Sequence, residues 1–91
     1  MKIERLTVRK DSYGSIREIR KTVCTAIDEH HYLLQCYSQY PRESDEWLDA
    51  GSTTNFDGQN KVNGVLMTCT IDTVGKKFDL LIEYEGYRRV D

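Results

Sequence analysis

Apolar and charged residues alternate over the start of the chain in the way that a half-buried β-strand requires. In residues 2–9 (KIERLTVR), Leu6 and Val8 fall on one side and Ile3 on the other, so the alternation is imperfect. Residues 11–14 (DSYG) combine residue types that are typical of tight turns. The pattern predicts a first strand over residues 2–9 that ends in a turn.

The next segment, residues 15–30, has apolar residues at helical spacing. Ser15 and Glu18 stand three positions apart, as in a capping box, in which two side chains satisfy free amides at a helix N-terminus. One apolar stripe of such a helix collects Ile16, Ile19, Val23, Ala26 and Ile27. These signals predict the main amphipathic helix of the protein.

The end of this helix is ambiguous in the sequence. Continued helical spacing runs to Tyr40 and stops before Pro41, which corresponds to a helix of about 25 residues or roughly 38 Å. The alternative ends the helix near Glu29 to His31 and makes residues 32–39 (YLLQCYSQ) a strand. Their aromatic content and the usual length of helices favour the strand, which we adopt.

The middle of the chain combines a short charged segment with a long polar one. In residues 41–51 (PRESDEWLDAG), Ser44 is placed to cap a single helical turn whose first residues are acidic. Residues 51–64 are rich in Gly, Asn, Asp, Ser and Thr, which predicts a loop with at most a short irregular strand. This loop contains two turn dipeptides, Asp57-Gly58 and Asn63-Gly64.

The C-terminal third has two apolar runs, residues 64–73 and 76–84, on either side of Val74-Gly75. A two-residue turn there pairs them as an antiparallel hairpin, and a slip of one residue would expose the whole apolar face. That face contains Val65, Met67, Cys69, Ile71, Phe78, Leu80, Ile82 and Tyr84. Residues 86–91 (GYRRVD) are expected to extend the last strand through a bulge at Gly86.

Together these elements predict an α+β fold in a single domain covering residues 1–91. One main amphipathic helix packs on a mixed or antiparallel sheet of three or four strands, in the order β-α-β-(short helix, loop)-β-β. A chain of 91 residues has room for one hydrophobic core.

Charge is unevenly distributed along the chain. Residues 1–21 carry seven Lys and Arg against three Asp and Glu, whereas residues 22–60 carry Arg42 alone against seven carboxylates. Such segregation either steers a charged partner or brings two solvated faces of the protein together.

Three features bear on the setting of the protein. No apolar run approaches the roughly 20 residues of a membrane-spanning helix, so we expect no membrane partner. Charges interrupt the N-terminal segment, which therefore lacks the apolar core of a signal peptide. The three cysteines, Cys24, Cys36 and Cys69, form no compact framework, which favours a reduced, cytoplasmic setting.

Residue types that ligate metals or act as nucleophiles are present but poorly spaced. The cysteines and the His30-His31 pair include no Cys-x₂-Cys pair of the kind that zinc sites use, and Cys69 falls on an apolar face. No nucleophile turn or nucleotide-binding motif is present. We expect no metal, no cofactor and no catalytic residue. A small enzyme that uses Cys24 or the histidines remains an alternative.

Nucleic-acid binding is a second alternative. The basic residues of the predicted first strand and helix, with Arg88 and Arg89, would form a basic patch, and the tyrosines offer stacking surfaces. The pI of about 5.7 and the acidic middle of the chain oppose contact with phosphates. We therefore rank nucleic-acid binding below the simpler interpretation, in which these cations are the solvated side of an ordinary helix and strand.

The only tryptophan, Trp47, lies in the densest run of carboxylates. Packing explains this if Trp47 and Leu48 turn into the core while the acids cap a helical turn. Alternatively, Trp47 is an exposed aromatic anchor inside an acidic rim, and such a surface suits a basic partner. The candidate partner-binding residues are Tyr37, Tyr40, Glu43, Asp45, Glu46, Trp47 and Asp49.

The absence of a catalytic pattern and the concentration of acids and aromatics favour a binding function. The preferred hypothesis is a small protein-binding module, an inhibitor or an immunity-type protein, that occludes a basic site on a partner protein. It would act as a monomer or a homodimer.

Overall fold

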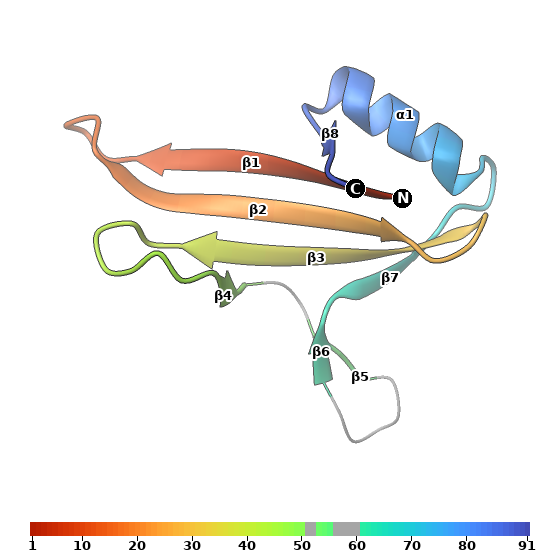
Figure 1. The fold of residues 1–91 in the computed structure, drawn as a ribbon, viewed down its shortest axis with the longest axis horizontal. Coiled ribbons are helices and arrows are strands. Elements are labelled where there is room, and N and C mark those ends of the chain that lie inside the picture. The colour runs from red at the N-terminus through yellow and green to blue at the C-terminus, as the bar shows by residue number, and fades with distance from the viewer. Residues whose placement is uncertain (51–52, 56–60) are drawn as a thin grey trace.

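The computed structural model describes residues 1–50, 53–55 and 61–91, and these form mainly β-sheet with one helix (Figure 1). The strands are β1 (Lys2–Lys10), β2 (Ile16–Ala26), β3 (His31–Gln39), β4 (Leu48–Asp49), β5 (Thr53–Asn55), β6 (Lys61–Asn63), β7 (Val65–Thr68) and β8 (Arg88–Arg89). The helix is α1 (Val74–Tyr84).

Within the described residues, six strands form one antiparallel sheet in the order β4-β3-β2-β1-β8, with β7 also paired to β3. Strands β4 and β7 share the outer edge of β3, because β4 pairs with Tyr37 and Ser38 and β7 with residues 31–34. Strands β5 and β6 pair only with each other and project beyond the edge of the sheet (Figure 1).

The predicted strands over residues 2–9 and 32–39 are confirmed by β1 and β3. The turn predicted over residues 11–14 is confirmed as well. The Asp11 carboxylate accepts the amide N–H groups of Tyr13 and Ser15, and Gly14 has a φ of 82°, which favours glycine.

The predicted main helix over residues 15–30 is wrong, because most of this segment forms β2. Its composition contains the missed signal: Ile16, Ile19, Thr22, Val23 and Thr25 are β-branched, which disfavours helix and favours strand. Strand β2 also hydrogen-bonds on both sides, to β1 and β3, so tertiary pairing outweighs the apolar spacing. Ser15 and Glu18 form no capping box, since Ser15 closes the turn with Asp11.

The predicted C-terminal hairpin is also wrong. Strand β7 covers only its start, and the residues after it form α1. Thr73 caps the helix by accepting the N–H of Lys76 at 3.3 Å, and the i,i+4 pair Val74 and Phe78 is buried. Ile71, expected on the apolar face, is 94% exposed. The buried apolar residues of this segment are therefore spaced for one side of a helix, although the sequence was interpreted as an alternating strand.

The chain after α1 does not extend a hairpin strand. Gly86 has a φ of 77° and follows the helix, and the N–H of Tyr87 bonds back to the carbonyl of Leu81 at 3.3 Å. The chain then reverses, and β8 pairs with the start of β1. Gly86 ends a helix here and makes no bulge in a strand.

The predicted α+β fold, with one main helix on a sheet of three or four strands, is therefore wrong, as is its element order. The protein is mostly sheet, and its single described helix is short and near the C-terminus. The element order β1–β7, α1, β8 differs from β-α-β-(short helix, loop)-β-β because the helix and strand assignments of residues 15–30 and 74–84 are exchanged.

The hydrophobic core lies between α1 and one end of the sheet. Ile3 of β1 pairs with Cys24 of β2, and Tyr32 lies diagonally from Cys24 on β3, two residues from its partner Leu34. Val74, Phe78 and Tyr87 cover these three residues. The rings of Tyr32 and Phe78 meet edge to face, with centroids 5.4 Å apart. We call this side of the sheet the helix face and the other side the open face, since no described helix packs on it.

The predicted turn at Asn63-Gly64 does not form, because these residues link β6 to β7. Gly64 has a φ of 152°, and a Cβ atom there would lie 2.7 Å from Cδ1 of the Leu33 side chain, so both the backbone conformation and the neighbouring side chain favour glycine. The other predicted turn, Asp57-Gly58, lies outside the described residues.

No helix in the described part of the chain has the length and apolarity needed to cross a bilayer.

Candidate protein-binding surface

Three of the predicted partner-binding residues, Tyr37, Trp47 and Asp49, meet on the open face. Tyr37 pairs with Lys21 of β2 on one side and with Asp49 of β4 on the other. The ammonium of Lys21 lies 4.3 Å from the centroid of the Trp47 ring and 5.3 Å from that of Tyr37. One cation therefore holds two aromatic rings through cation–π contacts.

The burial of Trp47 lies between the two alternatives that the sequence left open, a core residue and a fully exposed anchor. Trp47 is half-buried and lies outside the hydrophobic core. Leu48, expected to turn inward with it, is exposed. Lys21 covers part of the indole and leaves the rest to solvent, so Trp47 is a partly exposed aromatic group in a defined position.

The acidic residues Glu43, Asp45 and Glu46 lie in the exposed connection from β3 to β4. The helical turn predicted to start at Ser44 is absent. A turn precedes it instead, in which the N–H groups of Glu43 and Ser44 bond to the carbonyl of Tyr40, and Ser44 Oγ accepts the N–H of Glu46 at 2.9 Å. The side chain of Gln39 donates to the carbonyl of Asp45. These bonds hold the acidic segment in a compact turn against the end of β3.

Asn63 joins the acidic edge to the rest of the sheet. Its side-chain amide donates to the carbonyl of Cys36 at 2.8 Å and to the carboxylate of Asp49 at 3.2 Å. Gln35 donates in turn to the carbonyl of Asn63. Asn63 is only 7% exposed, and it fills the gap between β4 and β7 on the edge of β3.

Ion pairing differs sharply between the acidic and basic groups. None of the carboxylates of Glu43, Asp45, Glu46 and Asp49 forms an ion pair with a described side chain. Every arginine of the chain, in contrast, forms at least one ion pair. The acidic surface around Trp47 therefore keeps its charge available to solvent.

Tyr40 does not join this surface. It lies on the helix face, where its hydroxyl is 3.4 Å from Oε2 of Glu18. The same oxygen accepts the hydroxyl of Ser38 at 2.8 Å, and Arg9 and Arg20 each bond to Glu18 through Nε at 3.3 Å. Glu18 thus organises a polar cluster on the part of the helix face that α1 does not reach.

These contacts favour the charged form of Glu18. The hydrogen bond from Ser38 has the largest effect, and with those of Arg20 and Arg9 it outweighs desolvation and lowers the pKa to about 2. The residue is 7% exposed because its own partners cover it. A carboxyl group with this pKa stays ionised near neutral pH and is unsuited to general acid catalysis.

A second shared carboxylate, Asp11, joins the β1–β2 turn to the acidic segment. Arg17 and Arg42 both pair with it, at 3.2 and 3.7 Å. Desolvation opposes its ionisation, but the N–H groups of Ser15 and Tyr13, with the two arginines, bring its pKa below the usual value. The basic and acidic parts of the sequence therefore meet at this end of the sheet (Figure 1).

Three residues that organise this region, Lys21, Asn63 and Glu18, were not among the candidate site residues predicted from the sequence. Lys21 lay within the predicted helix but outside its apolar stripe, Asn63 was assigned to a turn and Glu18 to a helix cap. The alternation of β2 would have placed Lys21 and Glu18 on opposite faces, but no local signal predicts the Asn63 contacts.

The candidate nucleophiles and ligands do not converge in the described residues. Cys24 is buried in the core, and desolvation raises the pKa of its thiol to about 11, which disfavours the reactive thiolate. His31 bonds to Asp28, whose pKa is lowered chiefly by the N–H of His30 and by His31. No group of three His, Cys, Asp or Glu side chains suited to a metal occurs in the described part of the chain.

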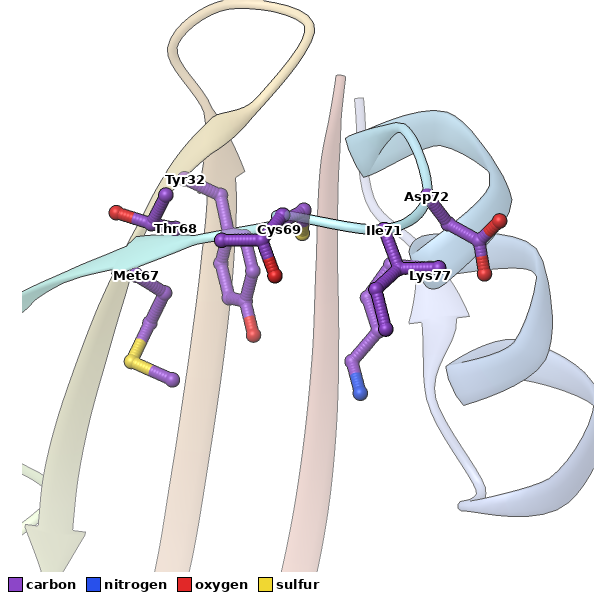
Figure 2. Close-up of a pocket in the computed structure, with 8 residues that line it drawn as sticks. Tyr32, Met67, Thr68, Cys69, Ile71, Asp72 and Lys77 are labelled. Atoms are coloured by element: carbon purple, nitrogen blue, oxygen red, sulfur yellow. The ribbon is translucent and has the colours of Figure 1, made fainter.

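A shallow pocket of about 270 Å³ lies where β3, β7 and the start of α1 meet (Figure 2). The side chains of Tyr32, Met67 and Lys77 point toward the same side in Figure 2, and the exposed Ile71 stands beside Lys77. The volume is slightly below the ~300–1,000 Å³ of typical ligand pockets. We assign it no ligand.

Comparison with protein-family models, with curated proteins and with solved structures finds no match for this chain.

Proposed function

We propose that the protein is a binding module that engages a basic surface of a partner protein through the acidic and aromatic surface around Trp47. The surface consists of Tyr37, Glu43, Asp45, Glu46, Trp47 and Asp49, and Tyr40 is left out because it lies on the other face. The observation that supports this most is that these carboxylates lack ion partners among the described residues while every arginine has one.

The arrangement suits a contact in which one aromatic group provides affinity and the surrounding charge guides the partner. Interface hot spots are often a tryptophan whose contacts exclude water, inside a ring of weaker polar contacts. Lys21 fixes the indole in place before binding, which lowers the entropy cost of ordering it. The free carboxylates would speed association with a basic partner, mainly at low ionic strength.

The finer role in this proposal is that of an inhibitor or immunity-type protein that covers a basic functional site of its partner. The setting is the cytoplasm, in keeping with three free cysteines. Nucleic-acid binding receives less support, because three arginines of the basic segment are already paired: Arg9 and Arg20 with Glu18, and Arg17 with Asp11.

Affinity capture from the native lysate tests the proposal with two double variants of equal charge. Glu43→Gln with Glu46→Gln alters the acidic surface, whereas Glu29→Gln with Glu83→Gln removes two exposed charges elsewhere. We expect the unaltered protein and the second variant to retain the same basic protein at low salt, and the first variant to lose it. Equal capture by all three, or no capture, contradicts the proposal.

Trp47→Ala measures the aromatic contribution against the captured partner. Loss of a hot-spot residue costs about 2 kcal/mol or more, so we expect affinity to fall about 30-fold. The measurement is the dissociation constant, with circular dichroism to verify the fold. A change of less than about threefold would remove Trp47 from the interface.

A further inference from the structure

The outer edge of β1 is open over most of its length. Strand β8 pairs only with Ile3 and Glu4, and from there to Lys10 no described strand lies on the outer side of β1, the side away from β2 (Figure 1). An unpaired strand edge presents a row of backbone donors and acceptors, which is the template for adding another strand.

The bonds at the start of β1 show which residues direct their backbone groups to this edge. The N–H of Lys2 donates to the carboxylate of Asp91, and its carbonyl accepts the N–H of Val90, both on the outer side. In an antiparallel ladder, alternate residues direct both polar groups to the same side. Leu6 and Val8 therefore direct theirs to the open part of the edge.

The side chains along this edge divide by chemistry between the two faces of the sheet. Leu6 and Val8 are 47% and 50% exposed on the open face, whereas Arg5 and Arg9 lie on the helix face. An incoming strand that alternates apolar and polar residues would match both sides.

Positive charge is in excess at this edge. Arg9 and Arg20 share the single carboxylate of Glu18, so one cationic charge is not balanced there. Lys10 has no ion partner among the described residues. Arg5 adds no free charge, since its guanidinium pairs with Glu85 at 3.8 Å and lies over the ring of Tyr87.

A second copy of the chain is a poor occupant of this edge. An antiparallel pair of two β1 strands centred on Thr7 sets Arg5 of each copy opposite Arg9 of the other. Like charges directly opposite destabilise a strand pair, and charged edge residues are a common protection against self-association. The charge excess instead complements a strand with acidic residues.

We infer that the edge of β1 from Leu6 to Lys10 binds an extended, acidic segment of a partner protein by β-strand addition. Acidic residues of that segment meet Arg9 and Lys10, and its apolar residues cover Leu6 and Val8. Backbone pairing distinguishes such a ligand from a nucleic acid, which offers no matching ladder. This site lies on the sheet edge opposite the Trp47 surface, so either proposal stands if the other fails.

The test uses the full chain, labelled with ¹⁵N, and a capped nine-residue peptide that alternates glutamate and valine. We expect the peptide to shift the amide signals of Leu6 and Val8 and to slow their hydrogen exchange. A matched peptide that alternates lysine and valine should bind at least about tenfold more weakly. Equal binding of the two peptides, no binding at millimolar concentration, or shifts confined to residues 37–49 would overturn the inference.

Substitutions at Val8 and Lys10 locate the contact. Val8→Pro removes an amide directed outward and leaves the ladder to β2 intact, so we expect the peptide to bind at least about tenfold more weakly. Its control, Val8→Thr, keeps that amide and should bind the peptide normally. Lys10→Glu needs no backbone change and should weaken the glutamate peptide and strengthen the lysine peptide. Unchanged peptide preference in Lys10→Glu contradicts the inference, as does a single-stranded deoxythymidine oligomer that produces the same shifts at Leu6 and Val8.

Discussion

The two ends of the sheet are stabilised by different forces. At the covered end, α1 packs on the helix face, and Ile3, Cys24 and Phe78 are fully buried. At the opposite end of the sheet, which contains the β1–β2 turn and which we call the hairpin end, α1 does not reach the strands. There, shared carboxylates and cation–π contacts hold the strands and the acidic segment together. Apolar burial provides most of the stability of a small domain, whereas polar side chains near solvent contribute little and stay available to partners.

The sharpest test of this comparison is Phe78→Ala at the covered end. Phe78 is fully buried, and removal of a buried phenylalanine side chain costs about 3–5 kcal/mol of unfolding free energy. Urea denaturation followed by circular dichroism measures the change. Leu80→Ala, an exposed position on the same helix, should change stability by about 0.5 kcal/mol or less. Similar losses in the two variants would show that the core does not lie under α1.

An intermediate effect is expected for Glu18→Gln at the hairpin end, because the substitution keeps the volume of the side chain and removes its charge. The folded-state pKa of about 2 lies below the usual value of 4.5. The stabilisation is therefore complete above the unfolded pKa and is lost as the pH falls from about 4.5 through about 2. We expect the variant to be less stable at pH 7 and to lose less stability across that window.

Acid titrations of the free energy of unfolding, run on both proteins, measure this difference. Glu83→Gln at an exposed site without a described ion partner is the control and should follow the unaltered protein. A parallel acid response of Glu18→Gln and the unaltered protein would contradict the role of the cluster.

The smallest expected effect belongs to Lys21 on the open face. Cation–π contacts at exposed sites contribute about 0.5–1 kcal/mol each. A double-mutant cycle with Lys21→Met and Trp47→Leu should therefore give a coupling energy of this size. Tryptophan fluorescence should also report a more exposed indole in Lys21→Met. A coupling energy near zero would mean that Lys21 does not position Trp47.

The sequence predicts those strands in which local pattern and tertiary environment agree. Strands β1 and β3 were predicted, and so was the Asp11 turn, whose contacts are all local. Strand β2 and α1 were interchanged because both segments fit two periodicities. In residues 16–26 the apolar spacing suits a helix and the β-branched residues suit a strand, and only pairing with two neighbours decides between them.

The sequence predicts which types of residue make up the candidate site, but not how they are arranged. The concentration of acids around Trp47 is visible in the sequence, and these acids are exposed. Their geometry was not predictable, because Lys21 and Asn63 reach them from distant parts of the chain. Tyr37 lies in β3 and Tyr40 directly follows its last residue, Gln39, so an odd separation of three residues separates the two rings onto opposite faces once the segment is known to be a strand.

By itself, the sequence determined the segments whose structure depends on neighbouring residues: two strands, a tight turn, and an acidic segment around a single tryptophan. The tertiary structure decided which segment became the helix, which face of the sheet it covers and which charges find partners. The physical reason is the distance along the sequence between the residues that interact. Turn chemistry acts over a few residues, whereas strand pairing, burial and ion pairs join residues that only the folded chain brings together.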